Sequence, residues 1–176
     1  MAERNTYKED VQKESTMVDQ VICVRRVTKV TKGGKRFSFS ALVVSGDKQG
    51  KVGVALGKSR EVSAAIAKAT NRARKNLVTI PLRGETLPYN VVGKHGASTV
   101  IMRAASKGTG VIAGGAVRAI MEVLGVKAIL AKSVGASNRV NTVKATFNAL
   151  AQLRGAQHIA KLRGKTIEQV MKGSHV

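Results

Sequence analysis

The sequence is poor in aromatic residues, with no tryptophan, three phenylalanines and two tyrosines among its 176 residues. Proteins that hold single-stranded nucleic acid commonly stack the bases on aromatic rings, so this composition argues against that mode of binding. Hydrophobic residues nevertheless make up 43% of the chain. We therefore expect a folded protein whose core consists mainly of aliphatic side chains.

Cysteine and clustered histidine are also lacking. Cys23 is the single cysteine, which excludes a disulfide framework and a zinc site of paired cysteines. It lies in the apolar run 21–24, so we expect a small buried hydrophobe. The three histidines and the carboxylates after residue 18 are isolated in the sequence. We accordingly predict no metal, no cofactor and no enzymatic activity.

No apolar stretch approaches the roughly 20 residues that cross a bilayer. The first residues also lack the apolar segment of a secretory signal. We expect no membrane association and a reducing, cytoplasmic location.

Acidic residues are scarce, with 10 against 31 basic residues and a net charge of +21. The first 18 residues hold four of the acids and three of the bases. The remainder is therefore strongly cationic, and such a chain repels itself unless a partner neutralises it. Its bases occur in ones and twos between apolar residues, which favours contact with a phosphate backbone over a wide surface. A merely soluble basic surface is the weaker alternative.

Composition and periodicity divide the chain into four segments. Residues 1–18 form a flexible N-terminal extension, 19–80 and 81–160 form two small domains, and 161–176 form a tail with a short helix. The boundary between the domains lies in the stretch 79–88, which contains both prolines and one glycine.

Alternating apolar residues in the first domain predict a meander of three strands, at 21–30, 37–45 and 52–56. The alternation slips at Arg25 and Arg26, which indicates a β-bulge there. We expect Phe37 and Phe39 to face the core and the opposite face of their strand to be freer.

The periodicity becomes helical over residues 58–76, with Ser59 as the N-cap. Its predicted apolar face contains Val62, Ile66, Ala69, Ala73 and Leu77. The first domain is therefore expected to have the order βββα.

The second domain is predicted to start with strands at 89–94 and 98–104, joined by a turn, and to contain a third strand at 128–131. We expect one helix over 117–124 with Gly125 at its C-terminal end. We also predict a helix that has Asn138 as its N-cap and ends at Gly155. A capping box at Thr166–Gln169 predicts the start of the short tail helix. The fold class is thus α+β, with two small domains.

The segment 108–113 matches a dinucleotide-binding pattern, GxGxxA. A nucleotide site would also need an acidic residue about 20 positions later, and none is present. Free backbone N–H groups at the following helix start could still attract a phosphate. Alternatively, Gly114 and Gly115 permit close packing of that helix.

Two acid-poor stretches of the first domain concentrate basic residues, one around the first hairpin and one on the helix that follows. We predict that these stretches and the glycine-rich segment contact the backbone of folded, double-helical RNA. The predicted RNA-binding residues are Arg25, Arg26, Lys29, Lys32, Gly33, Gly34, Lys35, Arg36, Lys58, Arg60, Lys68, Arg72, Lys75, Lys107, Gly108, Gly110, Gly114 and Gly115.

Several motifs match one known family. The stretch 32–44, KGGKRFSFSALVV, closely resembles the signature of the bacterial small-subunit ribosomal protein S-five family. The stretches 105–116, ASKGTGVIAGGA, and 163–168, RGKTIE, resemble the same family independently and in the expected order. The resemblance covers roughly residues 19–170.

This resemblance implies a double-stranded-RNA-binding-like βββα domain without the usual leading helix, followed by an S-five domain-two-like α/β domain. It also implies binding to small-subunit rRNA, contacts with ribosomal proteins S-four and S-eight, nearby mRNA at the entry path, and no homo-oligomer. Family roles are subunit assembly and translational accuracy. A free nucleoid-type DNA-binding protein remains the alternative that charge alone allows. The sequence leaves open whether the ribosome is bacterial or organellar.

Overall fold

The computed structural model describes residues 17–172. Most of the predicted N-terminal extension, residues 1–16, lies outside this range. The helices and strands follow in the order β1 (Val18–Thr31), β2 (Gly34–Gly46), β3 (Lys51–Ser59), α2 (Val62–Lys75), β4 (Val78–Thr79), β5 (Val91–His95), β6 (Ser98–Ala104), β7 (Val111–Ile112), α3 (Gly115–Leu124), β8 (Ile129–Gly135), α4 (Arg139–Ala151), α5 (Ala156–Arg163) and α6 (Ile167–Lys172).

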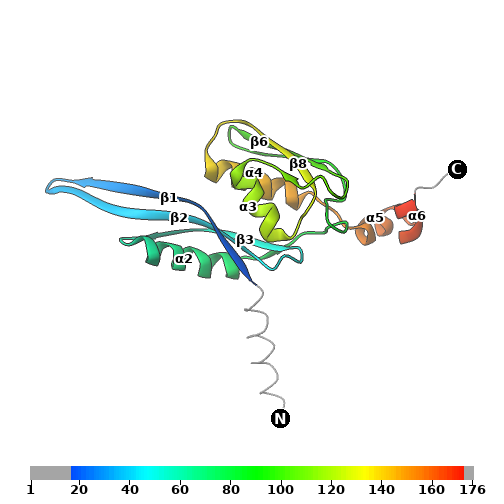
Figure 1. Cartoon of the computed structure of the whole chain (residues 1–176), viewed down its shortest axis with the longest axis horizontal. Coiled ribbons are helices and arrows are strands. Elements are labelled where there is room, and N and C mark those ends of the chain that lie inside the picture. Colours follow the sequence, from blue (N-terminus) through cyan, green and yellow to red (C-terminus); the bar gives the residue numbers. More distant parts are fainter. Residues whose placement is uncertain (1–16, 173–176) are drawn as a thin grey trace, which may run out of the picture.

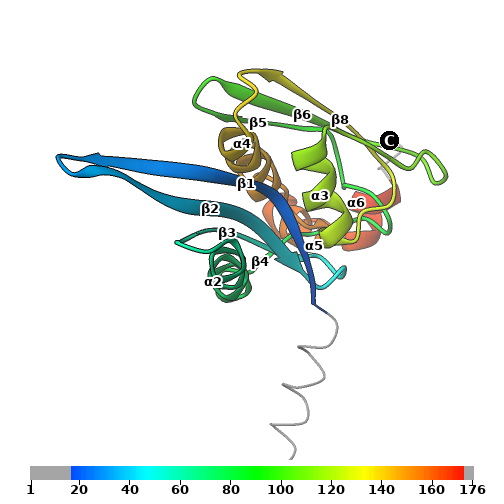
Figure 2. The same ribbon diagram turned by 60° about the vertical axis from the view of Figure 1, so that its left-hand side comes forward.

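The described residues contain two four-stranded sheets. These sheets and the helices α2, α3 and α4 form alternating layers (Figures 1 and 2). The first sheet has the order β1-β2-β3-β4 and the second has the order β5-β6-β8-β7. Helix α2 packs on the outer face of the first sheet, whereas α3 and α4 lie between the two sheets. The predicted α+β class and the βββα order of the first domain are confirmed.

Small residues allow α2 to lie directly on the first sheet. Its buried face consists of Ala65, Ala69 and Ala73. A Cβ atom at Gly53 would collide with the Ala73 carbonyl, and one at Gly57 would collide with the Ala65 carbonyl. Glycine on β3 is therefore a packing requirement of this helix.

The predicted start of α2 was wrong. The helix begins at Val62, and Ser59 is the last residue of β3 and not an N-cap. The cap position is Glu61, whose side chain makes no capping hydrogen bond. Val62, the first residue of the predicted apolar face, is 38% exposed, because the alanine face of the helix packs on the sheet instead.

The prediction that one face of β2 is freer was wrong for its second half, where all residues from Ser40 to Gly46 are buried. Ala41 and Val43 pack against α2, whereas Leu42 and Val44 belong to a larger cluster on the other side of the sheet. Both faces are covered because the second domain packs over the side opposite to α2.

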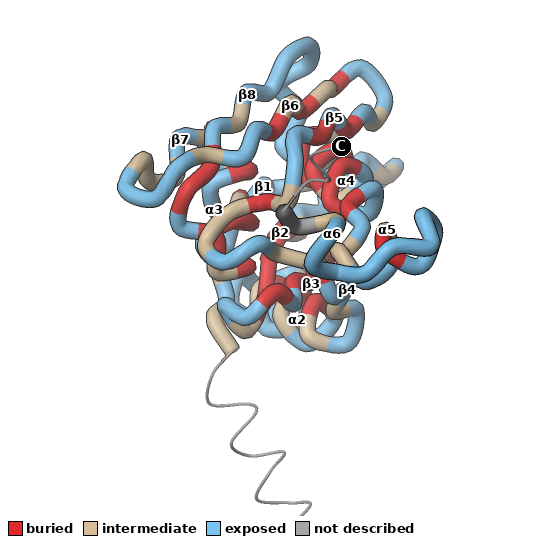
Figure 3. Tube along the Cα trace, turned by 90° about the vertical axis from the view of Figure 1, so that its right-hand side faces the viewer, coloured by how far each residue is buried: buried red, intermediate tan, exposed pale blue. Residues whose placement is uncertain are grey.

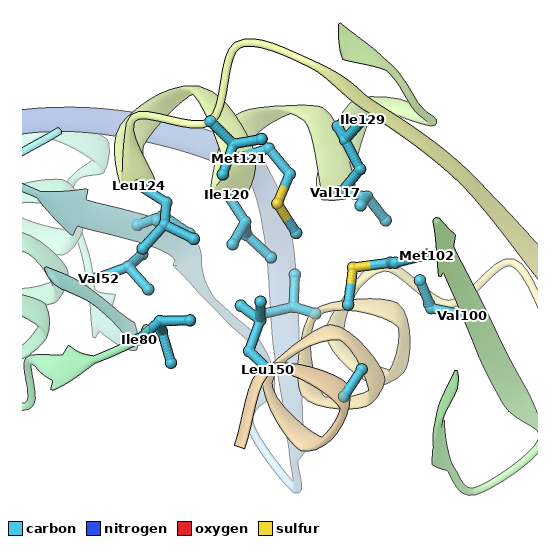
Figure 4. Close-up of a cluster of buried hydrophobic side chains, with 14 of the residues drawn as sticks. Val52, Ile80, Val100, Met102, Val117, Ile120, Met121, Leu124, Ile129 and Leu150 are labelled. Atoms are coloured by element: carbon cyan, nitrogen blue, oxygen red, sulfur yellow. The ribbon is translucent and has the colours of Figure 1, made fainter. Parts of the chain in front are cut away.

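The two predicted domains share one hydrophobic core. Val52 and Ile80 lie beside Ile120, Leu124 and the other side chains of the central helices (Figure 4). The buried positions run continuously through the middle of the molecule, with exposed positions at its outer layers (Figure 3). The boundary at residues 79–88 is therefore a boundary in sequence and not a gap in packing.

Backbone hydrogen bonds reinforce this junction. The turn between β2 and β3 approaches the C-terminal end of α3, where the Gly50 amide donates to the Leu124 carbonyl at 3.1 Å. Asp47 shapes the turn, since its Oδ1 atom accepts hydrogen bonds from the amides of Gln49 and Lys51. The predicted role of Gly125 is confirmed by its φ of 94° at the end of α3.

The helix ends of the second domain follow local sequence signals, with one exception. Asn138 caps α4, its Oδ1 atom accepting from the Val140 amide at 3.1 Å. Thr166 and Gln169 make both hydrogen bonds of the predicted capping box. Gly155, however, does not end α4: that helix stops at Ala151, and Gly155 is the N-cap of α5, a helix that was not predicted.

Three strand features also differ from expectation. The register of β1 shifts between Val21 and Cys23, and not at Arg25 and Arg26. The short strand β7 was not predicted, and β8 continues to Gly135, beyond the predicted end. Cys23 is buried, as predicted. Within residues 17–172, no helix is long and apolar enough to span a membrane.

Candidate nucleic-acid interface

The hairpin of β1 and β2 extends beyond the rest of its sheet as a two-stranded arm (Figure 1). Pairing of β2 with β3 ends at Phe39 and Ser59, whereas pairing of β2 with β1 continues to Gly34 and Thr31. Residues 27–38 therefore form the arm, and Lys32 and Gly33 form its turn. Gly34 has a φ of 132°, a backbone conformation that favours glycine.

A basic groove lies at the base of this arm, where β3 separates from β2. It has a volume of about 530 Å³ and brings together cations from β1, β2, β3 and the connection to α2: Lys29, Arg36, Lys58 and Arg60. No acidic side chain lines it. We refer to these four residues as the groove cations. The fold thus joins the predicted hairpin cluster to the first part of the predicted helix cluster.

Two groove cations face each other directly. Lys29 is the register partner of Arg36, so both side chains lie on the same face of the arm. Like charges at directly opposed positions destabilise a sheet. Since both residues are exposed and no carboxylate lines the groove, this arrangement favours a polyanionic ligand.

Phe37 lies on the other face of the arm, next to Arg26, which directly precedes the arm on β1. The Arg26 guanidinium carbon is 4.8 Å from the centroid of the Phe37 ring, which is a cation–π contact. Phe37 is 48% exposed, so its predicted core position was wrong. Phe39, by contrast, packs against the cluster beneath α2. The helix does not extend far enough along the arm to cover both rings.

The three predicted cations of α2 do not line the groove. Lys68, Arg72 and Lys75 are exposed on the helix surface. The Arg72 guanidinium also donates to the Leu56 carbonyl at 3.3 Å, which draws this side chain toward β3. These residues form a second basic surface, which we call the helix row.

The predicted glycine-rich site is divided between two places. Lys107 lines a hollow with Arg83 and Glu85, while Gly114 and Gly115 line another one, beside Arg139. Gly108 and Gly110 lie between Lys107 and Gly114 in the sequence and line neither hollow, and their φ values are 95° and 75°. A Cβ atom on Gly115 would meet nothing within 4 Å, and one on Gly114 would meet only Ser133, at 3.8 Å. The close-packing interpretation was therefore wrong for both residues.

An ion pair offsets part of the charge near Lys107. The Lys127 ammonium lies 2.7 Å from the Glu85 carboxylate. This hydrogen bond, together with the charge of Lys127 and a smaller contribution from Lys107, lowers the pKa of Glu85. Glu85 is consequently ionised at neutral pH, and this hollow is less cationic than the basic groove.

The sequence reasoning missed three hydroxyl groups that line the groove, those of Thr28, Ser38 and Ser59. Hydroxyls are common donors to phosphate oxygens. Their position depends on where β3 leaves β2, and no local sequence signal specifies that point. Among residues 17–172, no group of three His, Cys, Asp or Glu side chains is placed to hold a metal ion.

Two family models match the chain. The model of ribosomal protein S5, N-terminal domain, matches residues 17–81, and the model of its C-terminal domain matches residues 93–163. The first match includes the arm and the basic groove, and the second includes the glycine-rich segment.

Similar proteins occur in several bacteria and carry the name small ribosomal subunit protein uS5. The relative from Coxiella burnetii is 53% identical over 154 residues, which cover 88% of this chain and 92% of the relative. The relative from Flavobacterium psychrophilum is 55% identical over 155 residues, or 88% and 89% of the two chains. The relative from Lawsonia intracellularis is 52% identical over 161 residues, or 92% and 99%.

The two domain models match in the family's order, and the relatives are about 50% identical over nearly the whole length. The charge, the acid-free groove and the arm agree with a place beside rRNA. The chain belongs to the ribosomal protein S5 (uS5) family, whose members are non-enzymatic structural constituents of the small ribosomal subunit and take part in translation.

Proposed function

We propose that the basic groove and the turn of the arm bind phosphate groups of the small-subunit rRNA. The observation that carries this proposal is the convergence of the four groove cations without a neighbouring carboxylate. Charge-assisted contacts from lysine and arginine to phosphates release condensed counterions, which drives binding and makes it weaken as the salt concentration rises. The groove accordingly positions the protein on the RNA through the backbone and not through the bases.

The arm adds reach to this contact. Lys32, Gly33, Gly34 and Lys35 are exposed at its end, away from the shared core. A slender two-stranded arm can enter a space between RNA helices that the body of the protein cannot. In this proposal Lys32 and Lys35 contact phosphates there, and Arg25 and Arg26, which precede the arm on β1, contact phosphates near its base. The helix row contacts a separate RNA segment.

The glycine-rich segment provides a further contact in the second domain. Lys107, Gly108 and Gly110 lie in the loop after β6, and Gly114 and Gly115 lie at the start of α3. All five have backbone or side-chain groups at the surface, and the two α3 residues leave room for a ligand. We assign them to an RNA or protein contact, separate from the groove.

The finer roles follow from the family resemblance and extend the same proposal. They comprise subunit assembly, translational accuracy and lining of the mRNA entry path, with ribosomal proteins S-four and S-eight as neighbours. Family membership supports these roles. Protein–protein cross-links from the second domain within assembled small subunits test the two neighbours.

The central test is the salt dependence of rRNA binding. A double variant, Arg36→Gln with Lys58→Gln, removes two groove cations and keeps polar side chains. We expect weaker binding and a smaller slope of log K against log salt, by about one for each lost phosphate contact. The control, Lys144→Gln with Arg154→Gln, removes two exposed charges elsewhere. Equal slopes for both double variants would contradict the proposal.

A further inference from the structure

Ser38 lies among the cations of the basic groove. It follows Arg36 by two residues on β2, so both side chains lie on the same face of the strand. Lys29 is the register partner of Arg36. Lys58 is the register partner of Ser40, the next residue of β2 on that face. Ser38 is therefore a diagonal neighbour of both lysines, within the reach of long side chains.

The other two hydroxyl groups of the groove are placed differently. Thr28 is the register partner of Phe37. Ser59 is the register partner of Phe39, so both hydroxyls approach the groove from the opposite face. Of the three, Ser38 shares its face with the aligned groove cations. Its hydroxyl makes no hydrogen bond within residues 17–172, which leaves the oxygen available for chemistry.

The outer edge of β2 is open next to Ser38. Pairing between β2 and β3 ends at Phe39, whereas β2 itself continues to the turn of the arm. No described strand therefore pairs with the outer edge of residues 34–38. The opposed like charges of Lys29 and Arg36 also weaken the pairing on the inner side. An enzyme that binds its substrate as an extended chain can reach this stretch from the open edge.

The residues before Ser38 are basic. Lys35 and Arg36 precede it by three and two positions. Protein kinases distinguish their substrates partly by charge patterns of this kind. Ser38 is half-buried, whereas the other serines of β2 are less accessible: Ser40 is 9% exposed and Ser45 is 0% exposed. Ser38 is thus the serine of this strand that a kinase can reach.

We propose that Ser38 is a phosphorylation site and that its phosphorylation closes the basic groove to rRNA in the free protein. The Ser38 Oγ atom attacks the γ-phosphorus of a nucleoside triphosphate that is bound to a serine/threonine kinase. The bond from this phosphorus to the bridging oxygen breaks, the nucleoside diphosphate leaves, and the hydroxyl proton passes to a base of the kinase. The proposal rests on the rRNA contact proposed for the groove and adds its regulation.

A phosphate on Ser38 finds its counter-charges already in place. It carries a charge of about −1.5 to −2 at neutral pH and three strong acceptor oxygens. Arg36 lies beside it on β2, and Lys29 and Lys58 flank it on the neighbouring strands. These cations can form charge-assisted hydrogen bonds with the phosphate. The phosphate would then occupy the place of an rRNA phosphate and neutralise part of the charge that attracts the RNA.

Mass spectrometry of the full-length protein from the cells that make it tests whether the modification occurs. The chain is expressed in excess of rRNA, and the free and subunit-bound fractions are separated with phosphatases inhibited. Trypsin releases residues 37–48 as one peptide, FSFSALVVSGDK. We expect a phosphoryl group on Ser38 in the free fraction and none in the subunits. A free fraction without it, equal occupancy in both fractions, or a phosphate on Ser40 or Ser45 instead would overturn the proposal.

Phosphoserine incorporated at position 38 tests the effect on binding. We expect the affinity for rRNA to fall by about tenfold or more, and the slope of log K against log salt to decrease by about one for each lost phosphate contact. Phosphoserine at position 63 is the control, since Ser63 is exposed on α2, lines no part of the groove and receives the same charge. Its loss of affinity should be much smaller. Equal losses would contradict the proposal, because total charge and not position would then determine the effect.

A phosphorus NMR titration of the two phosphorylated proteins separates this proposal from the rRNA proposal. The groove cations should lower the second pKa of the phosphate on Ser38 below that of the phosphate on Ser63, since neighbouring positive charges favour the dianion. Equal pKa values would overturn the present proposal and leave the rRNA contact standing. A lowered pKa together with an unchanged affinity for rRNA would show instead that the groove holds a phosphate but not the RNA, which contradicts the proposed function.

Discussion

The backbone amide of Lys48 donates a hydrogen bond to the carbonyl oxygen of Val123 at a distance of 3.0 Å. Lys48 belongs to the turn between β2 and β3, whereas Val123 lies in the last turn of α3. The carbonyls at the end of a helix lack partners within that helix. One half of the chain thus satisfies backbone acceptors of the other half.

A glycine-to-alanine pair tests this junction. Gly125→Ala would place a Cβ atom against the Lys48 carbonyl, at a residue with a φ of 94°. We expect its free energy of unfolding to fall by more than about 2 kcal/mol, because left-handed strain and overpacking add together. Gly84→Ala is the matched control, since Gly84 also has a positive φ but faces open space. Its loss should be about 1 kcal/mol. Denaturant unfolding measures both, and similar losses would refute the packing argument.

Removing the repulsion between Lys29 and Arg36 should raise the stability of the free protein and weaken its binding to rRNA. We expect Lys29→Gln to stabilise the free protein by roughly 0.2–1 kcal/mol, because a like-charge pair disappears. The same variant should bind rRNA more weakly, since one groove cation is lost. Lys51→Gln is the control, because Lys51 is an exposed strand residue whose register partner is the neutral Thr79. The prediction fails if Lys29→Gln destabilises the protein more than the control does.

The contact between Arg26 and Phe37 should stiffen the arm. Phe37→Leu keeps an apolar side chain but removes the aromatic face, at a cost of about 0.5–1 kcal/mol. Amide hydrogen exchange should become faster in residues 27–38 and stay unchanged at Val52, which lies in the core. Arg26→Gln should give the same pattern, and the double variant should add little to either change. Fully additive effects would show that the two side chains act independently.

The pair of Glu85 and Lys127 predicts a specific pH response. The hydrogen bond from Lys127 and its charge lower the pKa of Glu85 from its ordinary value. The pair therefore contributes stability above the ordinary pKa of a glutamate and loses it as the pH falls through the lowered pKa. Lys127→Met should raise the pKa of Glu85 in an NMR titration, and Lys107→Met should raise it less. The stability difference between wild type and Lys127→Met should vanish in acid, and a difference that persists there would have another cause.

Local patterns in the sequence specified much of the fold. Alternation of apolar residues predicted the three-stranded meander, and the caps at Asn138 and Thr166 were confirmed because their partners lie within a few residues. The family motifs predicted both domains. In contrast, the helical periodicity wrongly placed Val62 on the packed face of α2. Gly53 and Gly57 on β3 let the alanine face of this helix approach the sheet instead.

Less of the candidate site than of the fold could be predicted from the sequence. Clustering of basic residues correctly indicated where positive charge concentrates. The groove, however, forms where β3 separates from β2, which brings Arg36 and Lys58 into one lining and leaves Lys68 elsewhere. Phe37 was misassigned because alternation alone does not show how far α2 extends along β2. Contacts between residues distant in sequence determine these features, and no window of the sequence contains them.

The core shared by both halves has a consequence for biosynthesis. Leu42, Val44 and Val52 emerge from the ribosome well before residues 115–124, which form the helix that covers them. Nascent chains fold from the N-terminus, and exposed apolar surface makes incomplete intermediates prone to aggregation. The apolar face of the first sheet therefore stays exposed during translation until α3 has been synthesised and can cover it.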